Sequence, residues 1–137
     1  MTVSFEKFTI LSNGNGDIID ITSKLQNIIQ TSDSDNFLIN IYTNSPYVSI
    51  ISADFEIQNA DFKKLLDSIY PLKIELNENK IQYSPDTFAN IRASILGRSL
   101  TIPVINKKIE LPNQEKVFLV DFSIQSSSYD VIIGLIK

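Results

Sequence analysis

The sequence predicts a single α+β domain, spanning residues 1–137, with a mixed or mainly antiparallel sheet and about three helices. Three observations support this fold class. A length of 137 residues fits one domain, and no repeat or linker divides the chain. Hydrophobic residues make up 43% and charged residues 20%, as in ordinary globular proteins. Strand-like segments follow one another without helices in the last third of the chain, which favours α+β over α/β.

The first half of the chain alternates strand and helix signals. NGNGD at 13–17 is a strong turn signal, because its two glycines accept positive φ angles. An apolar stripe predicts a helix over 23–32, with Thr22 or Ser23 as its N-cap. β-branched and aromatic residues predict four strands here, over 3–12, 17–21, 37–43 and 47–53.

The second half begins with a helix over 59–71 and a short hairpin over 73–84. A third helix follows, for which we expect Asp86 as the N-cap and Gly97 as the C-terminal stop. Its spacing predicts that Phe88, Ile91 and Ile95 face inward. The rest reads as strands: a hairpin over 100–111 that turns at 106–108, then 116–124 and 129–137.

Composition excludes several kinds of chemistry. The sequence has no histidine and no cysteine, so a Ser-His-Asp triad, a thiolate nucleophile and an ordinary zinc site cannot be built. We predict no metal and no cofactor. A net charge of −4 argues against nucleic acid as a partner. No apolar run of membrane-spanning length and no signal peptide is evident, so we expect a cytoplasmic protein that does not bind membranes.

The segment ANIRASILGRSLTIPV at 89–104 resembles A-H-[IL]-K-A-S-L-L-G-x-S-[LV]-T-I-P-V of the YjbQ-like family. The segment at 39–71 is similar to the family block that carries H-T-T-x-S-[LI]-T-[IL]-N-E-N and a helix ending in proline. These are small bacterial and archaeal proteins, some linked to a weak thiamine-phosphate synthase activity. The resemblance implies the family's α+β fold and a homotrimer.

The departures from this pattern fall on its reactive positions. Two family histidines fall on Thr43 and Asn90, and a third has no counterpart in this sequence. The lysine of the second motif falls on Arg92. Near the C-terminus, paired arginines of the family are replaced by Tyr129 and Asp130. Two acidic residues of the family pattern are retained in this sequence, at Asp86 and Asp121. The vestigial site positions that it implies are Thr43, Asn44, Ser45, Ser52, Asp86 and Asn90.

Our leading hypothesis is therefore a non-catalytic, degenerate member with a binding or scaffold role, because threonine and asparagine cannot carry a proton at neutral pH. Arg92 and Arg98, the only arginines, are candidates to hold a small anionic ligand. The alternative is a carboxylate-dependent enzyme acting on a phosphorylated small molecule, with residual synthase-like activity, Asp86 as base and Arg92 as anion holder. A purely structural role for Thr43 and Asn90, or partnership with a histidine-containing paralogue, also stays open.

Assembly is the last expectation from the sequence. The strands at 116–124 and 129–137 are long and apolar, and such strands must be covered or paired if they lie at a sheet edge. Gly134 indicates a bulge or a close backbone approach. We therefore expect a homotrimer whose interface includes the C-terminal strands. The alternative is that these strands lie in the centre of the sheet of a monomer.

Overall fold

The computed structural model describes residues 1–54, 61, 64–65, 68 and 85–137. The helix predicted over 59–71 lies mostly outside the described residues, and the hairpin predicted over 73–84 lies wholly outside them. Elsewhere, every strand expected from the sequence is present.

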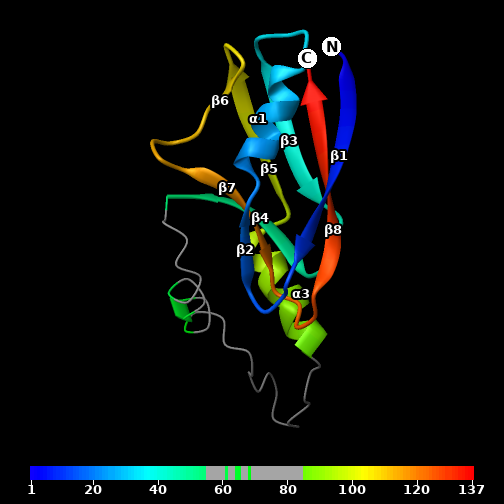
Figure 1. Ribbon diagram of the computed structural model, residues 1–137, viewed down its shortest axis with the longest axis vertical. Helices are drawn as coiled ribbons and strands as arrows, with labels where there is room; N and C mark the ends of the chain where they lie inside the picture. The colour runs from blue at the N-terminus through cyan, green and yellow to red at the C-terminus, as the bar shows by residue number, and fades with distance from the viewer. Residues whose placement is uncertain (55–60, 62–63, 66–67, 69–84) are drawn as a thin grey trace.

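The described strands form two antiparallel sheets (Figure 1). The five-stranded sheet has the order β1-β8-β3-β5-β6, and the three-stranded sheet has the order β2-β7-β4. The predicted α+β fold is confirmed, although the strands divide into two sheets and not one. The strands are β1 (Val3–Ser12), β2 (Asp17–Asp20), β3 (Phe37–Thr43), β4 (Val48–Ala53), β5 (Ser99–Ile105), β6 (Lys108–Ile109), β7 (Lys116–Asp121) and β8 (Ser127–Ile136).

Strand β7 lies between two hydrophobic clusters and contributes side chains to both. Val117 and Leu119 belong to the main core between the sheets, which also takes Leu25 and Ile29 from helix α1 (Thr22–Gln30). Phe118 and Val120 alternate with them and belong to a second cluster that contains residues of helix α3 (Pro85–Leu96). A strand buried on both faces needs a continuous apolar run, which β7 has.

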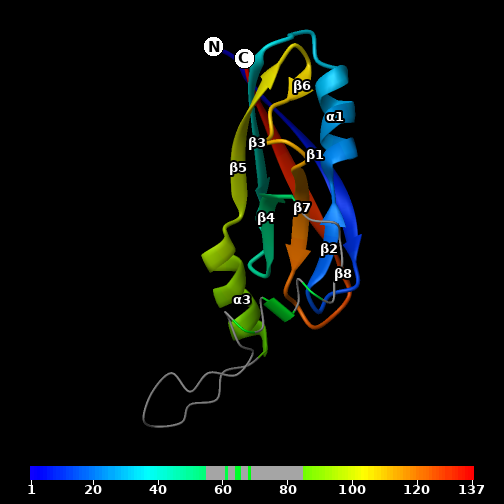
Figure 2. The ribbon, with the colours of Figure 1, turned by 90° about the vertical axis from the view of Figure 1, so that its left-hand side faces the viewer.

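The two described helices lie at opposite ends of the molecule (Figure 2). Helix α1 is near the chain termini, and helix α3 packs beside β4 at the other end. Within the described part of the chain, no helix is both long and apolar enough to span a membrane.

The start of α1 differs from the prediction. Neither Thr22 nor Ser23 caps the helix, because the N-cap position is Ile21 and makes no side-chain cap hydrogen bond. The Asp20 carboxylate accepts the Thr22 N–H at 2.9 Å instead. The Thr22 hydroxyl accepts the Val117 N–H at 2.9 Å, which ties the helix to β7. A long-range partner for its hydroxyl therefore displaced the local cap.

The buried face of α3 was also predicted wrongly in part. Phe88 is buried as expected, but Ile91 and Ile95 are 37% and 52% exposed. The face that packs on β4 carries Ala89 and Ala93, which are almost fully buried. Small side chains let the helix approach the strand closely enough for the Ser49 hydroxyl to donate to the Ala93 carbonyl at 3.0 Å. The helix ends before Gly97, whose φ of +95° fits the predicted C-terminal stop.

The C-terminal strands do not lie at sheet edges, so the expectation that they need cover there is wrong. Strand β8 lies between β1 and β3, and β7 lies between β2 and β4, so neither is an edge strand. Gly134 does mark a close approach, but within the chain: a Cβ there would lie 3.3 Å from the Phe5 ring. These two strands therefore give no support to the expected homotrimer.

Candidate functional site

The loop between β3 and β4 carries three of the positions implied by the family resemblance. Thr43, at the end of β3, is fully buried, and its hydroxyl accepts the Ser45 N–H at 3.3 Å. The Ser45 hydroxyl accepts the Tyr47 N–H at 3.3 Å. Such local hydrogen bonds from Ser and Thr stabilise turns, so these side chains shape the loop.

Helix α3 and the residue after its stop hold the same loop from the other side. The Asn90 side-chain amide donates to the Pro46 carbonyl at 3.0 Å. The Arg98 guanidinium donates to the Ser45 carbonyl at 3.1 Å and to the Pro46 carbonyl at 2.9 Å. The structure thus brings Thr43, Ser45, Asn90 and Arg98 together, although they are far apart in sequence.

The other predicted positions are not part of this group. Asn44 is exposed in the loop, and Ser52 lies on β4 on the same face as core residue Ile50, away from α3. Arg92 is buried on α3, with 8% exposure. Asp86 is the second residue of α3 and does not precede the helix as an N-cap would. Its side chain lies outside the described part of the structure.

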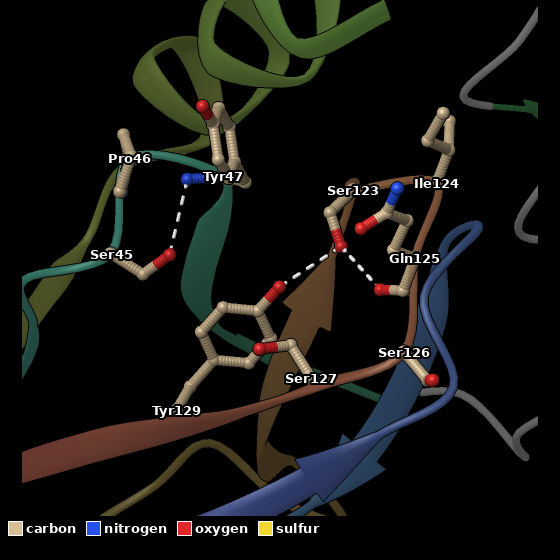
Figure 3. A pocket seen from close by; sticks show the side chains of 9 residues that line it. All are labelled: Ser45, Pro46, Tyr47, Ser123, Ile124, Gln125, Ser126, Ser127 and Tyr129. Carbon is tan, nitrogen blue, oxygen red and sulfur yellow. Dashed lines mark hydrogen bonds between the residues drawn. The ribbon is translucent and has the colours of Figure 1, made fainter.

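A cavity of about 430 Å³ lies next to the β3–β4 loop, between it and the loop that joins β7 to β8 (Figure 3). Of the predicted site residues, Ser45 alone lines this cavity. The volume suits a small molecule. The cavity is lined by Ser45, Pro46, Tyr47, Ser123, Ile124, Gln125, Ser126, Ser127 and Tyr129.

A fully buried carboxylate, Asp121, supports the floor of the cavity. Its Oδ2 accepts the Ser12 hydroxyl at 2.6 Å. Its Oδ1 accepts the Ser123 N–H at 2.9 Å and the Tyr129 phenol at 3.2 Å. The Ser123 hydroxyl lies 2.9 Å from the Tyr129 phenol and donates to the Gln125 carbonyl (Figure 3). These contacts hold the loop next to the carboxylate.

The Tyr129 phenol is held in its neutral form. Burial raises its pKa above the ordinary value, and the negative charge of Asp121 acts in the same direction. The hydrogen bond with Ser123 opposes this shift without cancelling it. Tyr129 is therefore a hydrogen-bonding phenol at neutral pH and not a base.

A spectroscopic titration tests this environment. Of the five tyrosines in the sequence, we expect Tyr129 to ionise at a higher pH than an exposed phenol in the folded protein. The Tyr129→Phe variant should lose this late step from the tyrosinate absorbance. Because the folded-state pKa is raised, the stability that the neutral phenol confers is complete below its ordinary pKa and is lost as pH rises through the folded-state pKa. An unchanged late step in Tyr129→Phe would contradict the assignment.

Sequence reasoning missed Ser123 and the cavity, and it saw Tyr129 only as a replacement. The signals were weak: the serine-rich segment QSSS at 125–128, which reads as a connection between two strands, and the acid at Asp121. Among the described residues, no three acidic side chains gather to form a metal-binding group.

Comparison with known proteins places the chain in a family. The sequence model of the family described as "UPF0047 protein YjbQ-like" matches residues 6–137. The chain belongs to the YjbQ-like family. A UPF0047 protein of Methanothermobacter thermautotrophicus is 25% identical over 122 residues, which cover 88% of this chain and 84% of that protein.

Solved structures of YjbQ-like proteins share the fold. A "YbjQ-like protein of unknown function" from Sulfolobus solfataricus P2 has a TM-score of 0.83 and 19% identity, covering 98% of this chain and 96% of that one. An uncharacterised YjbQ/UPF0047 protein from Clostridium acetobutylicum has a TM-score of 0.80 and 17% identity, covering 96% and 99%. At these identities the likeness shows the fold alone, and the family is one of unknown function.

Proposed function

We propose that this YjbQ-like protein is a non-catalytic small-molecule-binding protein that works as a homotrimer in the cytoplasm. One observation supports the non-catalytic role. At Thr43 and Asn90, where the family resemblance implied histidines, and at Arg98, a candidate for holding an anion, the polar atoms described above bond to the chain's own backbone. They stabilise the β3–β4 loop, and the neighbouring cavity supplies the binding site.

The carboxylate-dependent enzyme would need Asp86 and Arg92 to act together on a bound phosphate. Arg92 is buried on α3 and does not line the cavity described above. Binding of a small anion by Arg92 and Arg98 stays a prediction, and part of the Arg98 guanidinium is already engaged with carbonyl groups. Turnover of a phosphorylated small molecule that is lost in Asp86→Asn would overturn the non-catalytic proposal.

Histidine substitutions at Thr43 and Asn90 test whether the pocket implied by the family pattern persists at these positions. Because Thr43 is fully buried, Thr43→His should overpack the end of β3 and lower the free energy of unfolding by about 1–3 kcal/mol. Asn90 is only half-buried, so Asn90→His serves as the control and should change stability by less than about 1 kcal/mol. Thermal unfolding of both variants gives the comparison. Equal tolerance of the two histidines would mean that an open pocket persists at Thr43.

The outer face of the five-stranded sheet supports self-association. Helix α3 covers the outer face of the three-stranded sheet. Among the described residues, no element covers the outer face of the five-stranded sheet. Strand register aligns Val3, Ile136 and Leu38 in one row across β1, β8 and β3, and Phe5 lies in the next row over Gly134. Phe5 is 71% exposed, Val3 48% and Leu38 43%. Exposed apolar surface of this kind is typical of a protein interface.

Light scattering at micromolar concentration tests the assembly. We expect a mass three times the 15.5 kDa of one chain. Phe5→Lys should shift the mass towards one chain, because burying an unpaired ammonium group in an apolar interface is unfavourable. Asn27→Lys, on the exposed side of α1, is the matched control and should leave the trimer intact. A single-chain mass for the unaltered protein would disprove self-association, and a dimer would disprove the trimer.

A further inference from the structure

We propose that the cavity between the β3–β4 and β7–β8 loops binds a small organic cation, a substituted ammonium group. The inference rests on the proposed binding role and adds the chemical class of the ligand. It follows from three features of the site: an uncharged lining, a buried carboxylate beneath it and two tyrosine rings beside it.

The lining of the cavity offers nothing to an anion beyond neutral donors. Its nine residues are serines, tyrosines, a glutamine, a proline and an isoleucine, and none carries a formal charge at neutral pH. Anion-binding sites in proteins usually supply arginine or lysine. The hydroxyl groups of Ser45 and Ser127, by contrast, present oxygen atoms that can accept hydrogen bonds from an ammonium N–H.

The negative charge beneath the lining comes from Asp121. The carboxylate is fully buried and accepts hydrogen bonds from two hydroxyls and one backbone N–H, all of them neutral donors. No lysine or arginine in the described part of the chain pairs with it. Buried carboxylates are usually paired, so the field of Asp121 favours a cation in the adjoining cavity.

Tyr129 connects this charge to the cavity. Its phenol lies 3.2 Å from the Asp121 carboxylate, and the same residue lines the cavity. Burial is the main cause of the raised pKa of Tyr129, and the field of Asp121 adds to it because it disfavours a second negative charge at this place. An anionic ligand would meet the same repulsion as the tyrosinate.

Two aromatic residues line the site as well. Figure 3 shows Tyr47 and Tyr129 on one side of the cavity, with Ser123, Ile124 and Gln125 facing them across it. The electron-rich face of a tyrosine ring attracts cations, and quaternary ammonium groups are well suited to such contacts. Two tyrosine rings, one of them hydrogen-bonded to a buried carboxylate, therefore fit a substituted ammonium group better than a phosphate.

The test compares two probes of the same shape. Choline carries a quaternary ammonium, and 3,3-dimethylbutan-1-ol is its neutral isostere. In NMR titrations of the full chain, choline should bind at least tenfold more tightly than the alcohol and should shift the resonances of 45–47 and 123–129. Asp121→Asn should remove most of this preference, because it removes the charge and keeps the shape.

A second pair of variants avoids the buried network. Gln125 is an exposed lining residue, so a negative or a positive charge can be introduced there without disturbing the fold. Gln125→Glu should tighten choline binding several-fold and Gln125→Lys should weaken it several-fold, with the alcohol unaffected by either. Opposite shifts in two variants with unchanged melting temperatures would support the proposal even if Asp121→Asn failed to fold.

The outcomes separate the ligand class from the binding role. Equal affinity for the two probes, or tighter binding of inorganic phosphate at the same resonances, would overturn the cation inference while leaving a binding protein. Failure of choline to bind would overturn the inference as well. Catalytic turnover lost in Asp86→Asn would overturn the non-catalytic function, whatever the charge preference of the cavity.

Discussion

Replacement of Gly14 by alanine is expected to lower the free energy of unfolding by about 3–5 kcal/mol. Gly14 has a φ of +75°, in the left-handed region that favours glycine. A Cβ at this position would lie 2.7 Å from the Gln125 carbonyl oxygen and 2.9 Å from the Ser123 carbonyl oxygen. Both contacts are with backbone, so relief requires the β1–β2 turn to move away from the β7–β8 loop.

Gly97 provides the matched control. It also has a positive φ, +95°, but a Cβ there would meet no atom within 4 Å. Gly97→Ala should therefore cost only the backbone term, about 1–2 kcal/mol. Urea unfolding of the two variants measures the difference. Equal losses would show that backbone conformation alone, and not the close approach of the two loops, explains the requirement at Gly14.

Removal of the Asp121 carboxylate is the second change with a large expected effect. Asp121→Ala leaves the buried Ser12 hydroxyl, Ser123 N–H and Tyr129 phenol without their acceptor. Each buried donor without a partner costs about 1–3 kcal/mol, so a total loss of about 3–5 kcal/mol is expected after some hydroxyls rotate. This is a large fraction of the stability of a domain of this size. Urea unfolding measures the loss.

Asp121→Asn and Ser12→Ala divide this loss into parts. The asparagine oxygen can still accept from Ser123 and Tyr129, and its NH₂ group can donate to the Ser12 hydroxyl, so a cost of about 1–2 kcal/mol is expected. Ser12→Ala removes one of the three bonds and also the acceptor of the Gly14 N–H. We predict that Asp121→Ala lowers the free energy of unfolding more than Asp121→Asn does. An asparagine variant as unstable as the alanine variant would mean that the negative charge itself stabilises the fold.

The two predictions concern one structural unit. The Ser12 hydroxyl accepts the Gly14 N–H at 3.1 Å and donates to Asp121, and the Asn15 N–H donates to the Ser123 carbonyl. The β1–β2 turn therefore supports the loop that lines the cavity. Variants here should weaken ligand binding together with stability, whereas the Gln125 variants should change binding alone.

The candidate site was half predictable. The resemblance to the YjbQ-like family led to the β3–β4 loop and to Asn90, the scarcity of arginine led to Arg98, and the structure brings these together. It did not lead to the cavity, because Ser123 and the Tyr129 phenol derive their environment from Asp121 and from each other. Ordinary serines and tyrosines carry no local signal for such a network, and Asp121 gains its importance only from full burial.

Sequence alone determined the features that depend on neighbouring residues. It located the strands, a helix over 23–32 that the structure places at Thr22–Gln30, the glycine turn at 13–17 and the stop at Gly97. It also located the hairpin turn at 106–108, where Asn106 and Lys107 have positive φ. Each follows from φ preferences, alternation or periodicity within a few residues. These rules act along the chain and hold before any packing occurs.

Tertiary structure decided the features that depend on partners distant in sequence. It placed β7 and β8 in the interior of their sheets, because β2 and β1 at the other end of the chain pair with them. It turned Ile91 and Ile95 of α3 outward, since the small Ala89 and Ala93 allow the closer approach to β4. Periodicity identifies an apolar face of a helix, but the surface that the helix meets determines which face is buried, and that surface is assembled from residues that no local pattern connects.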